Sequence, residues 1–159
     1  MTIEAPYSKY SKNTFKGGIV LFLVVAIIFA YDGYLSKYEW SLRRSFYEEH
    51  VKDGKPDFDM VFNQKSPFVF VGLAAVTTVW FWARKNKKLL ADENELIISD
   101  RKRISYDSIQ QIDKTYFEKK GFFVITYKDQ GDNEVRLRLS DRKYDNLTAL
   151  LEHLVAKIS

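Results

Sequence analysis

The stretch VWFWARKNKK, residues 79–88, determines how the rest of the sequence is interpreted. Its large apolar residues end at Ala83, and cations follow at Arg84, Lys85, Lys87 and Lys88. Such a boundary is typical of two different structures. One is a nucleic-acid surface, where aromatic rings stack on bases and cations bind phosphates. The other is the end of a membrane span, where aromatic residues precede cytoplasmic cations.

Two long apolar runs favour the membrane. Residues 67–83, PFVFVGLAAVTTVWFWA, and residues 17–31, GGIVLFLVVAIIFAY, contain no charged side chain. A helix needs about 17–25 apolar residues to span a bilayer. The run at 17–31 reaches that length if the helix extends through Leu35, with Asp32 at the headgroup level. Both runs are apolar on every side, and the remaining chain is too small to enclose them as core helices. We therefore predict transmembrane helices at 17–35 and 67–83.

The aromatic and basic residues then have positions at a membrane boundary. Trp80 and Trp82 fall in the interfacial aromatic belt, and residues 84–88 form a basic linker. Rings that end an apolar run are not on a solvated surface, so nucleic-acid binding is not predicted. Membrane lipids are the expected partners, because each cation near an anionic surface gains roughly 1 kcal/mol. The topology rule alone also accounts for these cations.

Charge density predicts the orientation. Residues 1–16 carry three lysines as an N-terminal tail, and the basic linker holds the densest cations of the chain. The loop at 36–66 balances its cations with acids. Both termini are therefore predicted in the cytoplasm, with the protein in the cell (inner) membrane and the loop outside. A cleaved signal peptide is the alternative for the first run, but Ile28 stands where cleavage needs a small residue.

The outer loop and the second span each suggest local structure. Apolar residues recur at helical spacing over 34–51, which predicts an amphipathic helix, and Gly54 and Pro56 end it. Small residues let membrane helices approach closely, so Gly72 and Ala75 are predicted to pack against the first span or a neighbouring subunit.

The hydrophobic period changes from helical to alternating after Lys88. Residues 134–140, EVRLRLS, place Val135, Leu137 and Leu139 on one face and Arg136 and Arg138 on the other. Gly121 is predicted to lie in a turn, and Gly131 is predicted to take a positive φ in the hairpin loop DQGDN, residues 129–133. Residues 147–158 show an amphipathic helix with Asp145 or Asn146 as N-cap. The overall prediction is a membrane α + β protein, a two-helix hairpin followed by a small antiparallel domain with a C-terminal helix.

The pattern LLADENELIISDRKRISYDSIQQIDKTYFEKKGFFVITYKD resembles the bacterial PH-like domains that are attached to membrane proteins. The matching residues are Glu93, Asn94, Ile104, Tyr106, Ile109, Ile112 and Phe123 to Ile125. The resemblance covers residues 88–159, including the domain predicted at 89–159, and implies an antiparallel barrel with a closing helix that binds rather than catalyses. The matched segment is short for a complete barrel. Residues 87–92, KKLLAD, either supply a further strand or leave the barrel one strand short.

Catalytic signatures are weak throughout. Cysteine is absent, which excludes disulfides, cysteine-ligated zinc and thiol catalysis. No phosphate-binding or metalloprotease motif occurs. His50 could join a metal site only with ligands from elsewhere, and the DFD at 57–59 resembles a carboxylate pair without a nucleotide-binding fold around it. No enzyme activity, cofactor or metal is predicted.

Two function classes remain. The favoured one is a non-enzymatic membrane protein whose cytoplasmic domain binds a membrane-protein partner or a second copy, or assembles a complex. The alternative is a sensor of the membrane surface and its anionic headgroups. The candidate partner face consists of Arg101, Arg103, Arg136 and Arg138.

Overall fold

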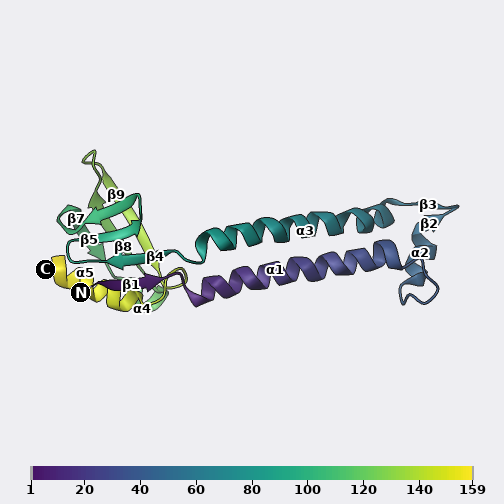
Figure 1. The fold of residues 1–159 in the computed structure, drawn as a ribbon, viewed down its shortest axis with the longest axis horizontal. Helices are drawn as coiled ribbons and strands as arrows, with labels where there is room; N and C mark the ends of the chain where they lie inside the picture. Colours follow the sequence, from purple (N-terminus) through teal and green to yellow (C-terminus); the bar gives the residue numbers. More distant parts are fainter. Residues whose placement is uncertain (1, 159) are drawn as a thin grey trace. The chain divides into compact units, whose positions relative to one another are not determined.

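The computed structural model describes residues 2–158. The chain forms two compact units (Figure 1). One is a helical hairpin, Thr14–Trp82. The other is a β domain built from residues up to Asn13 together with those from Ala83 onward. Each unit is described by itself.

Two long helices form the hairpin and run alongside each other (Figure 1). Helix α1 spans Lys9–Ala30, and α3 spans Phe58–Arg84. Both are long and apolar enough to cross a membrane, and only 11% and 17% of their most apolar windows are buried. The core helix of a soluble protein would be mostly buried. Both helices begin before the apolar runs at 17–31 and 67–83, because local caps rather than hydrophobicity determine where a helix starts.

Phenylalanine rings join the two helices of the hairpin. Phe15, Phe22 and Phe29 are seven residues apart in the sequence, which places them on one face of α1. Their partners lie along α3, so ring pairs build the contact over this length of the two helices. The pairs, with centroids 5.6–6.3 Å apart, are Phe15–Phe81, Phe22–Phe70, Phe29–Phe70 and Phe29–Phe62.

The predicted small-residue strip on α3 does not face α1. Gly72 and Ala75 are exposed, and a Cβ atom added at Gly72 would meet nothing within 4 Å. The small residues of α3 that are buried are Ser66 and Ala74, and Ala74 lies on the line adjacent to Gly72 and Ala75. The phenylalanines account for this difference, since their rings occupy the interhelical space and leave the glycine on the outer surface. Packing of the strip against a neighbouring subunit stays a prediction.

The loop between the helices is more folded than one amphipathic helix. A π-helical turn, η1 at Tyr31–Leu35, ends α1, and the chain then turns until α2 begins at Arg44 and ends at His50. The helix predicted over 34–51 is thus interrupted. The Arg43 guanidinium donates to both carboxylate oxygens of Asp32, at 3.0 and 3.2 Å, and this pair draws the chain back on itself.

A short hairpin completes the loop. Strand β2, Val51–Lys52, pairs with β3, Lys55–Pro56. The turn between them places Asp53 and Gly54 at φ 49° and 72°. Positive φ favours glycine and, among other residues, aspartate or asparagine. The helix break predicted at Gly54 and Pro56 is therefore where the chain reverses.

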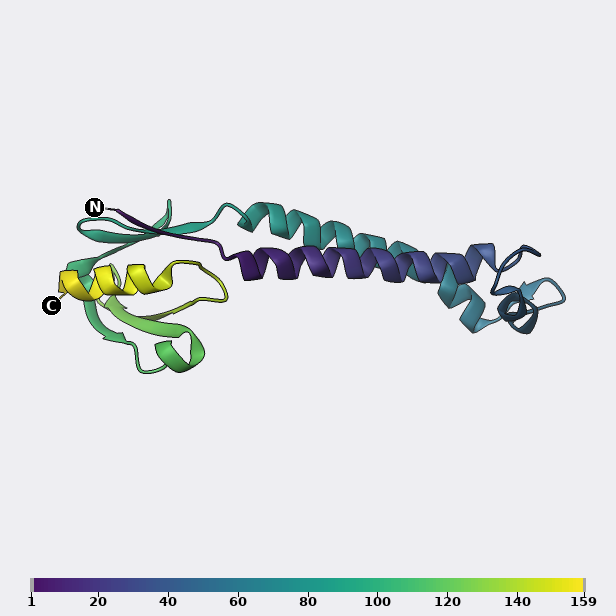
Figure 2. The same ribbon diagram turned by 90° about the horizontal axis from the view of Figure 1, so that it is seen from below.

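The first sheet of the β domain contains a strand from the N-terminus. Strand β1, Ile3–Pro6, pairs antiparallel with β4, Lys88–Ala91 (Figure 2). Strands β5, Glu95–Ser99, and β6, Lys102–Ser105, complete the order β1-β4-β5-β6. The sequence pattern predicts an N-terminal tail over residues 1–16. In the structure Ala5 is fully buried in the domain core.

The second sheet is an antiparallel meander of three strands. It contains β7, Ile109–Asp113, β8, Phe122–Lys128, and β9, Glu134–Ser140, in that order. A 3-10 turn, η2 at Tyr106–Ser108, leads into it, and the short helix α4, Phe117–Lys120, follows β7. The alternation predicted along residues 134–140 is present, with the arginines of β9 exposed.

Turn chemistry agrees with the prediction at one glycine and not at the other. Gly121 ends α4 at φ 66°, as expected for a helix C-terminus. In the β8–β9 loop the residue with positive φ is Asp132, at 61°, rather than Gly131. The Asp129 carboxylate accepts hydrogen bonds from the backbone N–H groups of Gly131 and Asn133, and these bonds shape the loop.

Helix α5, Leu147–Ile158, closes the domain. Its buried leucines join one core with the inner faces of both sheets. Neither predicted N-cap acts on α5 through its side chain in the bonds observed. Asp145 accepts from the backbone N–H of Lys9, at the start of α1, and the Asn146 amide donates to the Glu4 carbonyl. The residues before α5 therefore hold the N-terminal segment against the domain.

Candidate functional sites

The basic linker is partly absorbed into the two elements beside it. Arg84 is the last residue of α3, and Lys88 opens β4, where its ammonium lies 2.8 Å from the Glu4 carboxylate. The Lys87 carbonyl accepts a hydrogen bond from the Tyr7 N–H at 2.8 Å. The chain thus leaves β1 and returns to β4 at a hydrogen-bonded pair, Tyr7 and Lys87. The connection proper is Lys85–Lys87.

The aromatic residues before the linker are exposed within the hairpin. Trp80 and Trp82 expose 56% and 65% of their surface. Exposed indole rings at the end of an apolar helix suit a membrane–water boundary, where the ring meets lipid and the N–H meets water.

The four arginines of the predicted partner face are divided between the two sheets. Arg136 and Arg138 project from β9, where the Arg138 guanidinium lies 3.6 Å from the centre of the Phe122 ring. Arg101 and Arg103 belong to the β5–β6 turn and to β6, and Arg103 forms an ion pair with Glu95 at 2.9 Å. The structure therefore offers two arginine pairs on separate sheets rather than one arginine surface.

A groove lies beside Arg101 and Arg103. It runs between the β5–β6 turn and the β8–β9 loop, and Arg101, Lys102 and Arg103 line one side of it. The Lys102 ammonium stands 5.7 Å from the centre of the Tyr127 ring on the other side. Strand β6, whose residues line the groove, is an edge strand of its sheet. Such an edge can accept an extended peptide.

The structure also brings together three side chains that the sequence analysis treated apart. His50 is the last residue of α2, and Asp57 and Asp59 flank the start of α3. The His50 Nδ1 lies 2.8 Å from an Asp57 carboxylate oxygen and 3.8 Å from an Asp59 carboxylate oxygen. One donor atom from each residue falls within 4.8 Å of the others.

Hydrogen bonding sets the electrostatics of this cluster. The hydrogen bond between the His50 imidazole and the Asp57 carboxylate raises the pKa of His50 above its usual value. The backbone N–H of Met60, and then the imidazole of His50, lower the pKa of Asp57. Asp57 is also the N-cap of α3, since its other carboxylate oxygen accepts the Met60 N–H at 3.0 Å.

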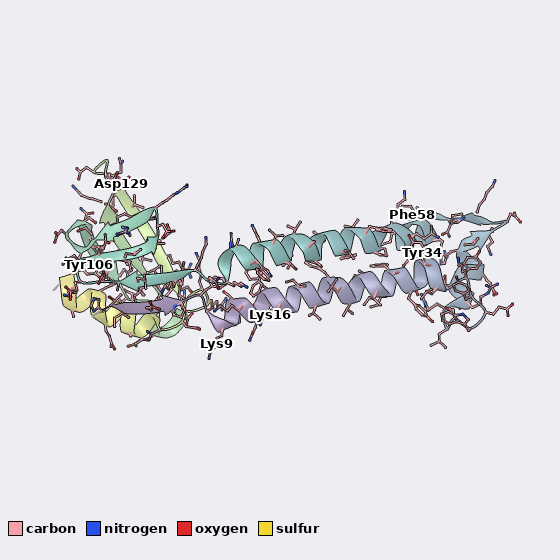
Figure 3. All side chains as sticks on the ribbon, viewed as in Figure 1. Lys9, Lys16, Tyr34, Phe58, Tyr106 and Asp129 are labelled. Atoms are coloured by element: carbon pink, nitrogen blue, oxygen red, sulfur yellow. The ribbon has the colours of Figure 1, made fainter. Side chains whose placement is uncertain are left out.

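The second histidine, His153, takes part in a hydrogen-bonded contact inside the β domain. His153 on α5 lies 3.1 Å from the Asp92 carbonyl, which also accepts the Tyr106 hydroxyl at 2.7 Å. Burial, followed by the charges of Asp92 and Glu95, raises the pKa of Tyr106 to about 12. The Tyr106 phenol thus remains a hydrogen-bond donor in the physiological pH range, and it ties η2 to the loop after β4 (Figure 3 labels Tyr106).

Two features were missed from the sequence. The phenylalanine pairs had a readable signal in the seven-residue spacing of Phe15, Phe22 and Phe29. The strand β1 had almost none, because four residues that end in a proline do not resemble a strand. No known family, curated protein or solved structure matched the chain when it was compared with each.

Proposed function

We propose that this chain is a non-enzymatic integral membrane protein whose PH-like domain lies in the cytoplasm and mediates protein interaction or assembly within a membrane complex. The observation that carries the proposal is the position of the helical hairpin in the chain. The hairpin is inserted between β1 and β4, two neighbouring strands of one sheet. The two ends of the hairpin therefore return to the same domain.

The exposed surface of the hairpin supports membrane insertion. Large apolar side chains cover its outer surface, and water would solvate them poorly. A bilayer provides the matching environment for helices of this length. These exposed residues include Val20, Leu21, Val24, Ile27 and Ile28 on α1, and Phe68, Val69, Val71, Val76 and Val79 on α3.

The architecture of the β domain supports the PH-like assignment. Sheets of four and three antiparallel strands share one core with a C-terminal helix. Strand β4 comes from the KLLA segment, and β1 comes from the N-terminus. Strand β4 is the further strand that residues 87–92 could supply, and β1 lies outside the segment that the resemblance covers.

Labelling of single cysteines tests the topology. The chain contains no cysteine, and Ser45 in α2 and Ser99 at the end of β5 are both exposed. In intact cells, Ser45→Cys should react with a membrane-impermeant maleimide, and Ser99→Cys should react only after the membrane is opened. The reverse pattern would place the domain outside the cell. Equal reactivity of the two cysteine variants in intact cells would show that no membrane separates Ser45 from Ser99, which contradicts the proposed membrane insertion.

Gentle isolation in detergent, followed by identification of co-purifying proteins, tests the interaction role. We expect a companion in stoichiometric amount. The two arginine pairs provide matched variants, Arg101→Glu with Arg103→Glu and Arg136→Glu with Arg138→Glu. Loss of the companion from one double variant alone assigns the binding face to that sheet. Retention in both shows that the arginines do not form the interface.

The same purified protein tests the alternative, a headgroup sensor. Nanodiscs of neutral lipid and of anionic lipid are compared for an effect on the mobility of a spin label at Ser99→Cys. A response to the anionic headgroup, with no companion protein in the isolation, would replace the assembly role with the sensor role.

A further inference from the structure

We propose that His50, Asp57 and Asp59 form a binding site for one divalent transition-metal ion of the Zn²⁺ type, in the loop that connects α1 and α3. This site lies within the hairpin unit and outside the β domain to which the interaction role is assigned. The inference therefore stands apart from the proposed function. It rests on which donors the loop brings together and on how firmly it holds them.

The β2–β3 hairpin brings the donors face to face. His50 immediately precedes β2, and Asp57 immediately follows β3. The backbone N–H of Asp57 donates to the His50 carbonyl at 2.9 Å, which closes the base of the hairpin. The turn with positive φ at Asp53 and Gly54 sets the register of the two strands. Residues 50 and 57 are thus held opposite each other by the backbone.

Side-chain contacts fix two of the donors further. The ring of Phe46 lies 4.3 Å from the His50 ring, centre to centre, and limits how the imidazole can turn. One carboxylate oxygen of Asp57 is held by the Met60 N–H, so the other oxygen points at His50. Donors that are already ordered lose little conformational entropy when an ion binds.

Asp59 lies in the first turn of α3, where the helix dipole favours an acidic side chain, and its carboxylate also faces His50. The bond between His50 and Asp57, together with the helix cap, accounts for Asp57. The Asp59 carboxylate is 3.8 Å from the same imidazole nitrogen, beyond hydrogen-bonding distance. An imidazole beside two carboxylates leaves a net negative charge whether or not the ring is protonated, and a metal cation among the three donors would neutralise it.

The donor set indicates the class of metal. An imidazole nitrogen suits zinc, copper, iron and nickel, whereas calcium and magnesium prefer sites made entirely of oxygen. Three protein ligands with room for water correspond to an open zinc site. The donors already lie within 4.8 Å of one another, so small rotations of the side chains bring them to coordination distance.

The test is a calorimetric titration. Metal is first removed from the full-length protein in detergent with a chelator, and ZnCl₂ is then titrated in while the heat of binding is measured. We expect one ion per chain. Asp59→Asn should weaken binding at least about tenfold, the smallest loss that follows removal of even an outer-sphere partner of a metal ligand. The matched control is Asp53→Asn in the same hairpin, because asparagine also tolerates the φ of 49° at that position. This control should bind as the wild type does.

A second measurement keeps the test independent of variant folding. The chain has two histidines, so their ring resonances can be followed in the unmodified protein. Stoichiometric ZnCl₂ should move the resonances of His50 and leave those of His153 unchanged. The proposal fails if the wild type shows no saturable binding of one ion, or if Asp59→Asn binds as tightly as Asp53→Asn. It also fails if the His50 resonances stay in place.

Discussion

Gly33, in the π-helical turn η1 that ends α1, lies directly against the backbone of α3. A Cβ atom there would lie 2.7 Å from the carbonyl carbon and oxygen of Asn63, both backbone atoms that cannot move aside easily. Pro67 lies four residues further along α3 and has no N–H to donate to that carbonyl. A hydrogen bond next to this contact stabilises it, since Tyr34 donates its hydroxyl to the Gln64 carbonyl at 2.7 Å.

The first prediction concerns this glycine. Gly33→Ala should lower the melting temperature of the purified protein in detergent, because the added methyl group forces the helix ends apart. Gly72→Ala is the matched control, since nothing lies within 4 Å of the added atom. The control should match the wild type or exceed it slightly, as alanine favours a helix over glycine. Equal melting temperatures for the two variants would contradict the close contact at Gly33.

At the scale of single elements, the loops depend on side chains that bond to the backbone. The Asp129 carboxylate organises the β8–β9 loop through the N–H groups of Asn133 and Gly131, and these bonds lower its pKa (Figure 3 labels Asp129). In the hairpin unit, Tyr34 lies in η1, which ends α1, and Phe58 is the first residue of α3 (Figure 3 labels both). Between them, residues 36–43 form a bend that the Asp32–Arg43 pair holds.

The second prediction concerns pH and the β8–β9 loop. The unfolded pKa of an aspartate is about 3.9, and that of Asp129 is lower in the folded protein. The charged carboxylate therefore stabilises the fold above pH 4, and this contribution disappears as the pH falls through the lowered pKa. Asp129→Ala should melt below the wild type at pH 7, and the gap should narrow towards pH 3. A gap that is independent of pH would show that the charge does not hold the loop.

The third prediction concerns the bend at 36–43. Trp40 and Leu42 are 66% and 92% exposed in this segment, and the Tyr38 ring stacks on Trp40 at 5.6 Å. Because the bend directly follows the apolar helix, these side chains should rest in the bilayer interface of the proposed membrane protein. In a variant that keeps only Trp40, brominated lipids should quench its fluorescence.

A variant that keeps only Trp80 is the reference for the quenching measurement, because Trp80 lies at the predicted aromatic belt. Comparable quenching of both indoles is the expected result. Quenching of Trp80 without quenching of Trp40 would place the bend in water, and the exposed leucine would then need a protein to cover it.

At the scale of the whole molecule, the β domain is discontinuous in sequence. Strand β1 contributes the buried Ala5, and Ser8 caps the start of α1 while its hydroxyl bonds to the Arg142 carbonyl. The Tyr7–Tyr144 bridge adds a further link between the N-terminal segment and the chain before α5. The segment that looked like a tail is thus part of the domain.

The fourth prediction follows from this discontinuity. A polypeptide of residues 87–159 should be less stable than one in which residues 2–8 are joined to it by a flexible linker. Without β1, one edge of β4 is unpaired and the Leu89 side of the core loses cover. Urea denaturation followed by circular dichroism measures the difference. Introducing Ala5→Asp into the linked polypeptide should remove the gain, because it buries a charge. Equal stability of the first two polypeptides would show that β1 is dispensable.

The sequence by itself determined the features that depend on local pattern. The two apolar runs form long helices, as their length and composition predicted. The alternation along 134–140 and the leucine face of residues 147–158 are also confirmed, because hydrophobic periodicity reports directly which face of an element is buried. The turn at Gly121 followed from backbone sterics, which are equally local.

Only the tertiary structure decided which distant residues meet. Strand β1 is held by pairing with β4, more than eighty positions away, and its own residues show no strand pattern. The phenylalanine rings displaced Gly72 from the helix contact because packing depends on volumes on both helices at once. His50, Asp57 and Asp59 became one cluster through a reversal of the chain between them. Each of these depends on contacts across the fold, where no single local pattern specifies the partner.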